Sequence, residues 1–348
     1  MGAALRGDGR RLVAAGSPYA VDPGTLQNQS AQPFKVFTPF AKAWRASGWT
    51  APAERPEALF VRDLKGLGLP SAPSVAATLP AAGEAAGLEV LERFLAEMVD
   101  RYAERRNRPA VPGTSRLSVH LKYGTVHPRT VLAGLGPEPE SKGRSTFRSE
   151  LCWREFYADV LWHRPDTTLR AFNPAMTTMQ VDEGPAADRR FAAWAKGRTG
   201  YPLVDAGMRQ LQAEAWVHNR VRMVVASFLV KDLHVDWSRG ARLFLDRLVD
   251  GDLASNHHGW QWVAGTGTDA APYFRIFNPV SQSRKFDPKG IYLATHLPEL
   301  AGLPPDERHE PWLARAKGAD LGGYPEPIVD HATEREEALR RYAAVRAE

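Results

Sequence analysis

Residues 250–262, DGDLASNHHGWQW, bring together side chain types that could carry chemistry. Two aspartates, one asparagine, two histidines and two tryptophans lie in this stretch, and a Gly/Thr-rich turn follows it. The adjacent histidines have poor spacing for a shared metal ion, and an EF-hand is excluded because its sixth and twelfth positions are Ser255 and Gln261. We therefore predict no metal here. Two alternatives stay open: a platform for stacking on a base or ring cofactor, or a capped turn with core tryptophans.

A second set of polar side chains falls on one face of a helix predicted over residues 148–163. Glu150, Trp153, Arg154 and Tyr157 are spaced at i, i+3, i+4 and i+7, which places them on the same side of the helix. A solvated face with a Glu–Arg pair is the alternative. A tryptophan in the middle of that polar face favours a binding surface instead.

The start of a helix predicted over residues 217–234 carries Asn219, Arg220 and Arg222 next to Trp216. A lone Asn or Arg at a helix start is usually a cap or a solvated charge. Three such residues beside a tryptophan indicate a site.

A weaker indication comes from residues 113–124, GTSRLSVHLKYG, which place Thr114, Ser115 and Ser118 at the start of a predicted helix. Such a terminus favours phosphate through its dipole and its free N–H groups. Ser and Thr at a helix start are nevertheless most often simple caps.

The elements that must position these residues are mostly helices. A short helix is expected over residues 37–49, residues 67–86 are typical of a Pro/Ala-rich linker, and residues 333–348 predict a charged, solvated helix. Helical patterning dominates from residue 87, with helices expected over 87–105, 115–135, 148–163, 188–196, 202–215, 217–234 and 238–248. Residues 10–26 predict one strand followed by a Pro/Gly loop, although a strand without a neighbour is not stable alone.

Composition narrows the class of protein. The 348 residues are 43% hydrophobic and 24% charged, as in a soluble globular protein. Cys152 is the single cysteine, so no intramolecular disulfide is possible and we expect a reducing cytoplasm. The longest apolar run, at 223–230, is too short to span a bilayer, and the net charge of +5 weakly favours an acidic partner such as nucleic acid.

Seven motifs together resemble one known family. KVFTPFAKAW, GTSRLS, ELCWREFY, GYPLVDAGMRQL, WVHNRVRM, DGDLASNHHGWQW and GTDAAPYFRIFNP occur in that order over roughly residues 35–330. They resemble the class I photolyase/cryptochrome family, and within it the bacterial cyclobutane pyrimidine dimer photolyases. The resemblance implies a mainly α fold, in which residues 87–340 form a helical domain that holds a U-shaped FAD.

The same resemblance assigns the remaining segments. It implies that residues 1–35 are a remnant strand and helix of the family's N-terminal α/β (antenna) domain, and that residues 36–86 are the first helix and linker. We therefore expect no complete site for a second, antenna chromophore. The sequence leaves open whether the chain is a fragment or a mis-started product.

The resemblance also implies residue roles. Glu150 matches the carboxylate that hydrogen-bonds the dimer, and Trp153 with Trp262 matches the apolar wedge around a flipped thymine dimer. Asn256 matches the residue facing flavin N5, and Arg222 is expected to pair with Asp250. The implied cofactor contacts are Tyr102, Thr114, Ser115, Arg116, Leu117, Ser118, Trp153, Arg154, Asn219, Arg222, Asp250, Asp252 and Asn256, and Asn219 is also expected to take part in catalysis.

Further residues match the family's electron donors and DNA contacts. Trp260 and Trp237 match the first two members of a chain of three tryptophans, but residues 164–193 contain no Trp or Tyr for the third. Our hypothesis is that flavin photoreduction is slow or rerouted. Arg106, Arg220, Arg275 and Lys285 match positions near the DNA backbone, where neutralised phosphates make affinity salt-dependent.

The implied function is light-driven repair of cyclobutane pyrimidine dimers in DNA. Excited, reduced anionic FAD passes one electron to the dimer and recovers it after the ring opens. A (6-4) photolyase is the closest alternative, although WVHNRVRM has Asn219 where that group typically carries histidine. A blue-light photoreceptor of the cryptochrome type and an inactive truncated photolyase are the others. We expect a monomer that acts on UV-damaged DNA.

Overall fold

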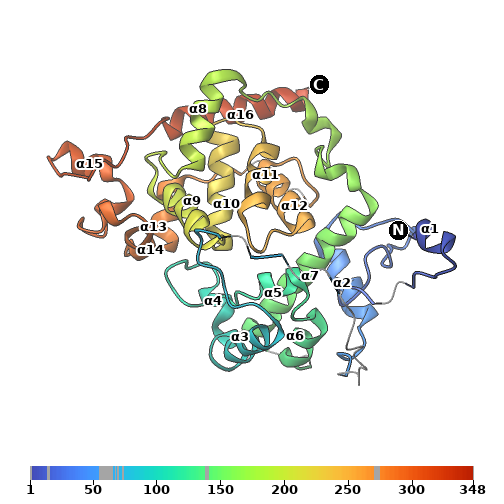
Figure 1. The fold of residues 1–348 in the computed structure, drawn as a ribbon. Coiled ribbons are helices and arrows are strands. Elements are labelled where there is room, and N and C mark those ends of the chain that lie inside the picture. The colour runs from blue at the N-terminus through green and yellow to red at the C-terminus, as the bar shows by residue number, and fades with distance from the viewer. Residues whose placement is uncertain are drawn as a thin grey trace.

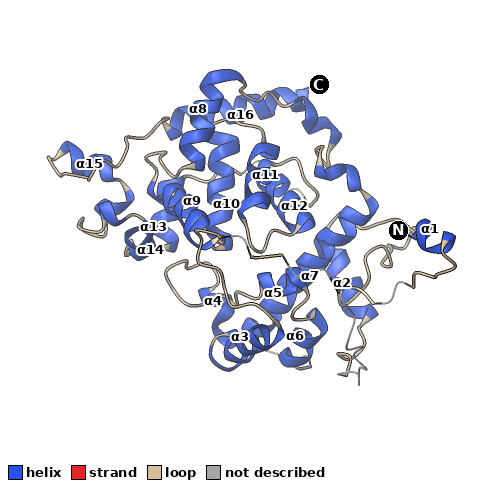
Figure 2. Cartoon of the chain, viewed as in Figure 1, coloured by secondary structure: helices blue, strands red, loops and turns tan. Residues whose placement is uncertain are grey.

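The computed structural model describes residues 2–13, 16–54, 66, 68, 70–72, 74–137, 141–269 and 275–347. Within these residues every regular element is a helix (Figures 1 and 2). None of these helices is both long and apolar enough to cross a membrane. The predicted mainly α fold is therefore confirmed.

The α-helices are α1 Gly2–Gly7, α2 Phe37–Ser47, α3 Glu84–Glu97, α4 Tyr102–Arg105, α5 Ser118–Tyr123, α6 Pro128–Leu135, α7 Lys142–His163, α8 Gly184–Ala195, α9 Pro202–Glu214, α10 Asn219–Ser227, α11 Trp237–Arg247, α12 Leu253–Ala264, α13 Pro279–Phe286, α14 Ile291–His296, α15 Pro311–Ala316 and α16 His331–Ala347. Short 3-10 helices are η1 Val99–Arg101, η2 Pro165–Thr168, η3 Pro174–Thr178, η5 Pro298–Leu300 and η6 Glu307–His309, and η4 Phe228–Asp232 is a π-helical turn.

Two predicted helices are interrupted. The helix expected over 115–135 is two helices, α5 and α6, because Gly124 takes a left-handed conformation with φ of 69° and ends the first. The helix expected over 217–234 ends at Ser227 and continues as the π-helical turn η4. The linker expected over 67–86 lies partly outside the described residues, and α3 begins inside it at Glu84.

The predicted N-terminal strand is wrong for the part of residues 10–26 that the structure describes. Residues 10–13 belong to no helix or strand, and Leu12 and Val13 are 56% and 63% exposed. A β-strand needs a partner strand to satisfy its backbone N–H and C=O groups, and the described residues supply none.

The helices pack into two hydrophobic cores. The first core joins α2, α3, α6 and one side of α7 around Phe40, Trp44 and Phe156. The second core joins α8 to α12 and α14 around Trp194 and Phe228. Figure 1 shows α3–α6 gathered at the bottom of the view, α9–α12 above them, and α7 running alongside both groups. Because α7 packs directly against α12, it connects the two cores.

Glu155, on the first-core side of α7, fixes the N-terminal loop and α2. Its carboxylate accepts the backbone N–H groups of Ala20 at 2.6 Å and Val21 at 3.0 Å, and the indole N–H of Trp44 at 2.6 Å. The side chain is buried, so the three donors replace its lost hydration. Burial raises the pKa of Glu155, and these donors oppose that rise.

In the second core, α11 and α12 approach closely at Gly240. A Cβ atom at this position would lie 2.3 Å from Cη2 of Trp260 and 2.6 Å from a methyl carbon of Leu229. Only glycine therefore allows the Trp260 indole to lie directly over the α11 backbone.

Candidate functional site

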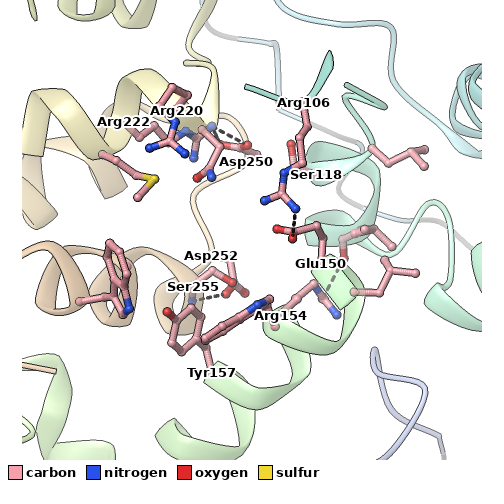
Figure 3. A pocket seen from close by; sticks show the side chains of 18 of the residues that line it. Arg106, Ser118, Glu150, Arg154, Tyr157, Arg220, Arg222, Asp250, Asp252 and Ser255 are labelled. Carbon is pink, nitrogen blue, oxygen red and sulfur yellow. Dashed lines mark hydrogen bonds and ion pairs between the residues drawn. The ribbon is translucent and has the colours of Figure 1, made fainter. Parts of the chain in front are cut away.

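A cavity of about 750 Å³ lies between the two cores. The first-core side is formed by α7, the start of α5 and Arg106, and the second-core side by α10, α12 and the loop before α12 (Figure 3). Its volume falls within the range of about 300–1,000 Å³ typical of ligand pockets. Residues from all four sequence regions singled out above therefore face one space.

The predicted polar face of α7 lines this cavity. Glu150, Trp153, Arg154 and Tyr157 all contribute to the wall, as the helical spacing predicts. Arg106 donates to Glu150 across the cavity wall, with Nη1 and Oε1 2.5 Å apart. Burial opposes the charged form of Arg106, but Glu150 outweighs it and the pKa of Arg106 is raised.

On the second-core side the expected pair of Arg222 and Asp250 is formed. Nη2 of Arg222 lies 3.0 and 2.8 Å from the two carboxylate oxygens of Asp250, and Nε donates to the carbonyl of Val217 at 2.7 Å. Asp252 begins α12 as its N-cap and accepts the Ser255 N–H at 2.8 Å. Both aspartates line the cavity at the start of α12 (Figure 3).

Arg154 is held by backbone carbonyls. Its two terminal nitrogens donate to Pro18 at 3.1 Å and Leu121 at 3.2 Å, and the guanidinium lies 4.5 Å from the centroid of the Tyr19 ring. The side chain thereby ties the N-terminal loop to α5 at the edge of the cavity.

The two tryptophans expected to form the wedge, Trp153 on α7 and Trp262 on α12, both line the large cavity. Asn256 instead lines a smaller adjoining cavity of about 160 Å³, together with Trp260. Asn219, with several residues of α10 and α12, lines both cavities. The amide of Asn256 donates to the carbonyl of Ala241 at 2.8 Å.

The other predicted residues divide into two groups. Ser115, Leu117, Ser118, Arg220 and Arg275 line the large cavity. Tyr102, Thr114, Arg116 and Lys285 are not among its lining residues. Tyr102 packs in the first core against Phe94 and Phe147, and Arg116 pairs with Glu214 at 3.0 Å.

Several lining residues were not predicted from the sequence: Lys122, Met223, Ser255, Gly259 and Asp269. Tyr157, by contrast, was expected at the site, because it lies on the same helical face as Glu150 and Trp153. Burial raises the pKa of its phenol, so it stays protonated. Asp269 had no such signal, since only chain folding brings it to the cavity.

Sequence relatives decide the family. The family model described as the FAD binding domain of DNA photolyase matches residues 147–344. Deoxyribodipyrimidine photo-lyase of Escherichia coli (strain K12) is 40% identical over 354 residues, covering 97% of this chain and 74% of that protein. The chain belongs to the DNA photolyase family.

Solved structures of photolyase relatives agree with the fold. A bacterial class III photolyase from Agrobacterium tumefaciens matches with a TM-score of 0.90 and 39% identity, over 99% of this chain and 76% of that one. A cryptochrome from Synechocystis matches with a TM-score of 0.80 and 31% identity, over 93% and 71% of the two chains.

The cavity of this photolyase fits FAD. Leu117, Leu121 and Val263 give apolar wall for a ring system, while cationic and hydroxyl side chains suit a pyrophosphate. The polar set comprises Ser115, Ser118, Lys122 and Arg154. The Arg222–Asp250 pair and Asp252 supply fixed charges at the opposite side.

The tryptophans expected to transfer electrons have different neighbours. Trp260 packs edge-on against Trp194, with ring centroids 6.1 Å apart, and both rings are buried. Trp237 packs against His257 at 6.2 Å. In this photolyase the ring next to the smaller cavity therefore has Trp194 as an aromatic neighbour on α8.

Proposed function

We propose that this chain repairs cyclobutane pyrimidine dimers in DNA with light, as a deoxyribodipyrimidine photo-lyase. The main support is that Glu150, Trp153 and Trp262, from two helices, line one cavity. Arg106, Arg220 and Arg275 line the same cavity. A carboxylate and two indoles suit a flipped, stacked pyrimidine pair, and the arginines suit DNA phosphates. Relatives about 40% identical carry the name of this activity.

In this proposal the two indoles exclude water and hold the extruded dimer by stacking. Glu150 accepts hydrogen bonds from the pyrimidines, which opposes dissociation of the damaged bases. Arg106 holds the Glu150 carboxylate at the cavity wall through the 2.5 Å contact. The ion pair also neutralises the half-buried negative charge of Glu150, which would otherwise repel the DNA phosphates.

FAD, when bound in its reduced form and excited by light, supplies an electron to the dimer and regains it after ring opening. Ser115, Ser118 and Arg154 are proposed to hold its phosphates and adenosine side. Asp252, Asn219 and Asn256 are proposed to contact its flavin ring, with Arg222 fixed by Asp250. Tyr102, Thr114, Leu117 and Arg116 remain predicted contacts from the motif match.

The finer assignments stay predictions. Membership of class I rests on the sequence motifs, whereas the similar Agrobacterium structure is that of a class III photolyase. The cryptochrome match gives a second candidate, a blue-light photoreceptor. The presence of Trp153 and Trp262 in one cavity favours repair because a photoreceptor needs no lesion wedge. A monomeric state and the segment boundaries at residues 35 and 86 also remain proposals.

Repair of a defined substrate tests the function. The purified chain with reduced FAD is mixed with an oligonucleotide that carries one thymine dimer, and the intact thymines recovered after illumination are measured. We expect repair in light and none in the dark. The variant Glu150→Gln keeps the side chain's shape but loses its charge, so about tenfold slower repair with unchanged FAD content is expected. No repair by the FAD-loaded wild-type chain would contradict the proposal, and repair of a (6-4) photoproduct instead would favour the alternative.

A further inference from the structure

Phe37 lies face to face with the cavity tryptophan Trp153. The two rings are parallel within 5°, with centroids 3.7 Å apart. The other aromatic neighbours of Trp153 meet it at an angle: Phe156 at 76° and Tyr157 at 43°. Phe37 is not among the lining residues of the cavity, whereas Trp153 is. Phe37 therefore supports the indole from behind.

A cluster of hydrogen bonds fixes the backbone on either side of Phe37. The carbonyl of Lys35 accepts the Thr268 hydroxyl at 2.6 Å and the Asp269 N–H at 3.2 Å. The Phe37 N–H donates to the Asp269 carboxylate. We call these contacts, between residues 35–37 and residues 268–269, the clamp.

The clamp connects the two sides of the cavity. Thr268 and Asp269 follow α12, which carries Trp262, and Asp269 itself lines the cavity. Phe37 begins α2 and rests against Trp153 of α7. Thr268 is only 2% exposed, so its hydroxyl has to be paired with Lys35 to avoid an unsatisfied buried group. The position of one wedge tryptophan is thus tied to the loop that follows the other.

We propose that Phe37 is a positioning residue for lesion binding, which sets the plane of the Trp153 indole and is itself set by the clamp. The inference rests on the proposed repair function, since it assigns Trp153 to the damaged bases. An offset of the indole plane weakens stacking on the dimer, because aromatic stacking depends on ring geometry. FAD binding and the chemistry of ring opening do not depend on Phe37.

The variant Phe37→Leu tests this role, with Phe40→Leu as its matched control. Phe40 lies one turn further along α2, is 2% exposed and contacts Phe34 and Phe156. We expect Phe37→Leu to raise KM for the dimer oligonucleotide about fivefold, with kcat, FAD absorption and affinity for undamaged DNA unchanged. Phe40→Leu is expected to lower Tm at least as much with KM unchanged, and Phe37→Tyr to restore KM.

The clamp is tested by Thr268→Val against Thr266→Val. Both replace a buried hydroxyl by a methyl group, but the Thr266 hydroxyl has no hydrogen-bond partner among the described residues. We expect Thr268→Val to raise KM about threefold and Thr268→Ser to retain the wild-type KM. Thr266→Val is expected to leave KM unchanged.

A second measurement separates this inference from the repair function. Acrylamide quenching of Trp153 fluorescence, taken as the difference between each chain and its Trp153→Phe counterpart, reports whether the indole is held. Increased quenching in Phe37→Leu supports the positioning role even if the wild-type chain repairs no dimer. A failure of the wild-type chain to repair the dimer contradicts only the proposed repair function. If the wild-type chain repairs dimers while Phe37→Leu changes neither KM nor quenching, the positioning role is overturned.

Discussion

The two polar atoms of the Asn256 side chain have different surroundings. Its amide nitrogen donates to the carbonyl of Ala241, which leaves the side-chain oxygen as the acceptor at the smaller cavity. Asn219 and Asp252 line both cavities, so a ligand could extend from one cavity toward the other past Asn256.

Because we propose that Asn256 contacts the flavin ring, we expect its replacement to affect the oxidation state of the flavin more than FAD binding. In Asn256→Ala we expect FAD content to stay near that of the wild-type chain, because the larger cavity is unchanged. The reduced flavin is expected to reoxidise faster in air, since it loses a side-chain contact at its reactive edge. Absorption spectra after photoreduction measure the rate. Asn256→Asp, which keeps an oxygen acceptor, is the control, and identical reoxidation in Asn256→Ala would argue against the assigned role.

At the scale of elements, α7 is the helix on which most of the site depends. One side carries Glu150, Trp153 and Tyr157 into the cavity, and the other side packs in the first core. Glu155 on that second side anchors both the N-terminal loop and α2. The orientation of α7 is thus fixed by a buried carboxylate with three donors.

The variant Glu155→Gln is expected to destabilise the fold. An amide NH2 replaces one carboxylate oxygen and opposes at least one of the N–H donors, so a buried donor is left unpaired. We expect a loss of about 2–3 kcal/mol in the free energy of unfolding, measured by denaturant titration. Glu92→Gln on the exposed side of α3 is the control and should change stability by less than about 0.5 kcal/mol. Equal free energies of unfolding for Glu155→Gln and Glu92→Gln would contradict the role of Glu155 in anchoring the N-terminal loop and α2.

Sequence periodicity predicts the face of α7 but not the existence of α12. The α7 face was predicted because all its residues lie on one helix at fixed spacing. Helix α12 was not predicted, because buried residues such as Ala254, His257 and Gln261 lie on several of its sides and leave no amphipathic pattern. The Arg106–Glu150 contact and the placement of Asn256 depend on how separate helices pack, which spacing along the chain does not specify.

Across the whole molecule, buried histidines make stability depend on pH. Burial is the main cause that lowers the pKa of both His218 and His258 to about 4, and arginines around His218 add to it. Both side chains are at most 3% exposed. In the unfolded chain a histidine titrates near 6.5, so between these values the unfolded state binds more protons.

The free energy of unfolding should therefore show no loss from these two histidines above pH 6.5, and it should fall as the pH drops toward 4. Each of the two histidines contributes a loss of about 3 kcal/mol over that window. In His258→Gln we expect the slope of unfolding free energy against pH to decrease by about 1.4 kcal/mol per pH unit. Urea titrations at several pH values measure the slope, and an unchanged slope would show that His258 is protonated in the folded chain.

DNA affinity is the second property of the whole surface. Lys285, in the exposed last turn of α13, is a predicted phosphate contact. In Lys285→Ala we expect weaker binding of damaged and undamaged DNA alike, and the slope of log K against log salt should decrease by about 0.9. Lys196→Ala, at the exposed end of α8, is the control. Equal salt-dependence slopes for Lys285→Ala and Lys196→Ala would indicate that the DNA does not contact Lys285.

Gly240 has a further consequence for the smaller cavity. Because Gly240 has no side chain, the Trp260 indole packs directly on the α11 backbone, which moves less readily than a side chain would. A molecule that binds beside Asn256 therefore contacts a cavity wall that is already ordered before binding. Little ordering entropy then remains to be lost at this end of the pocket when a cofactor arrives.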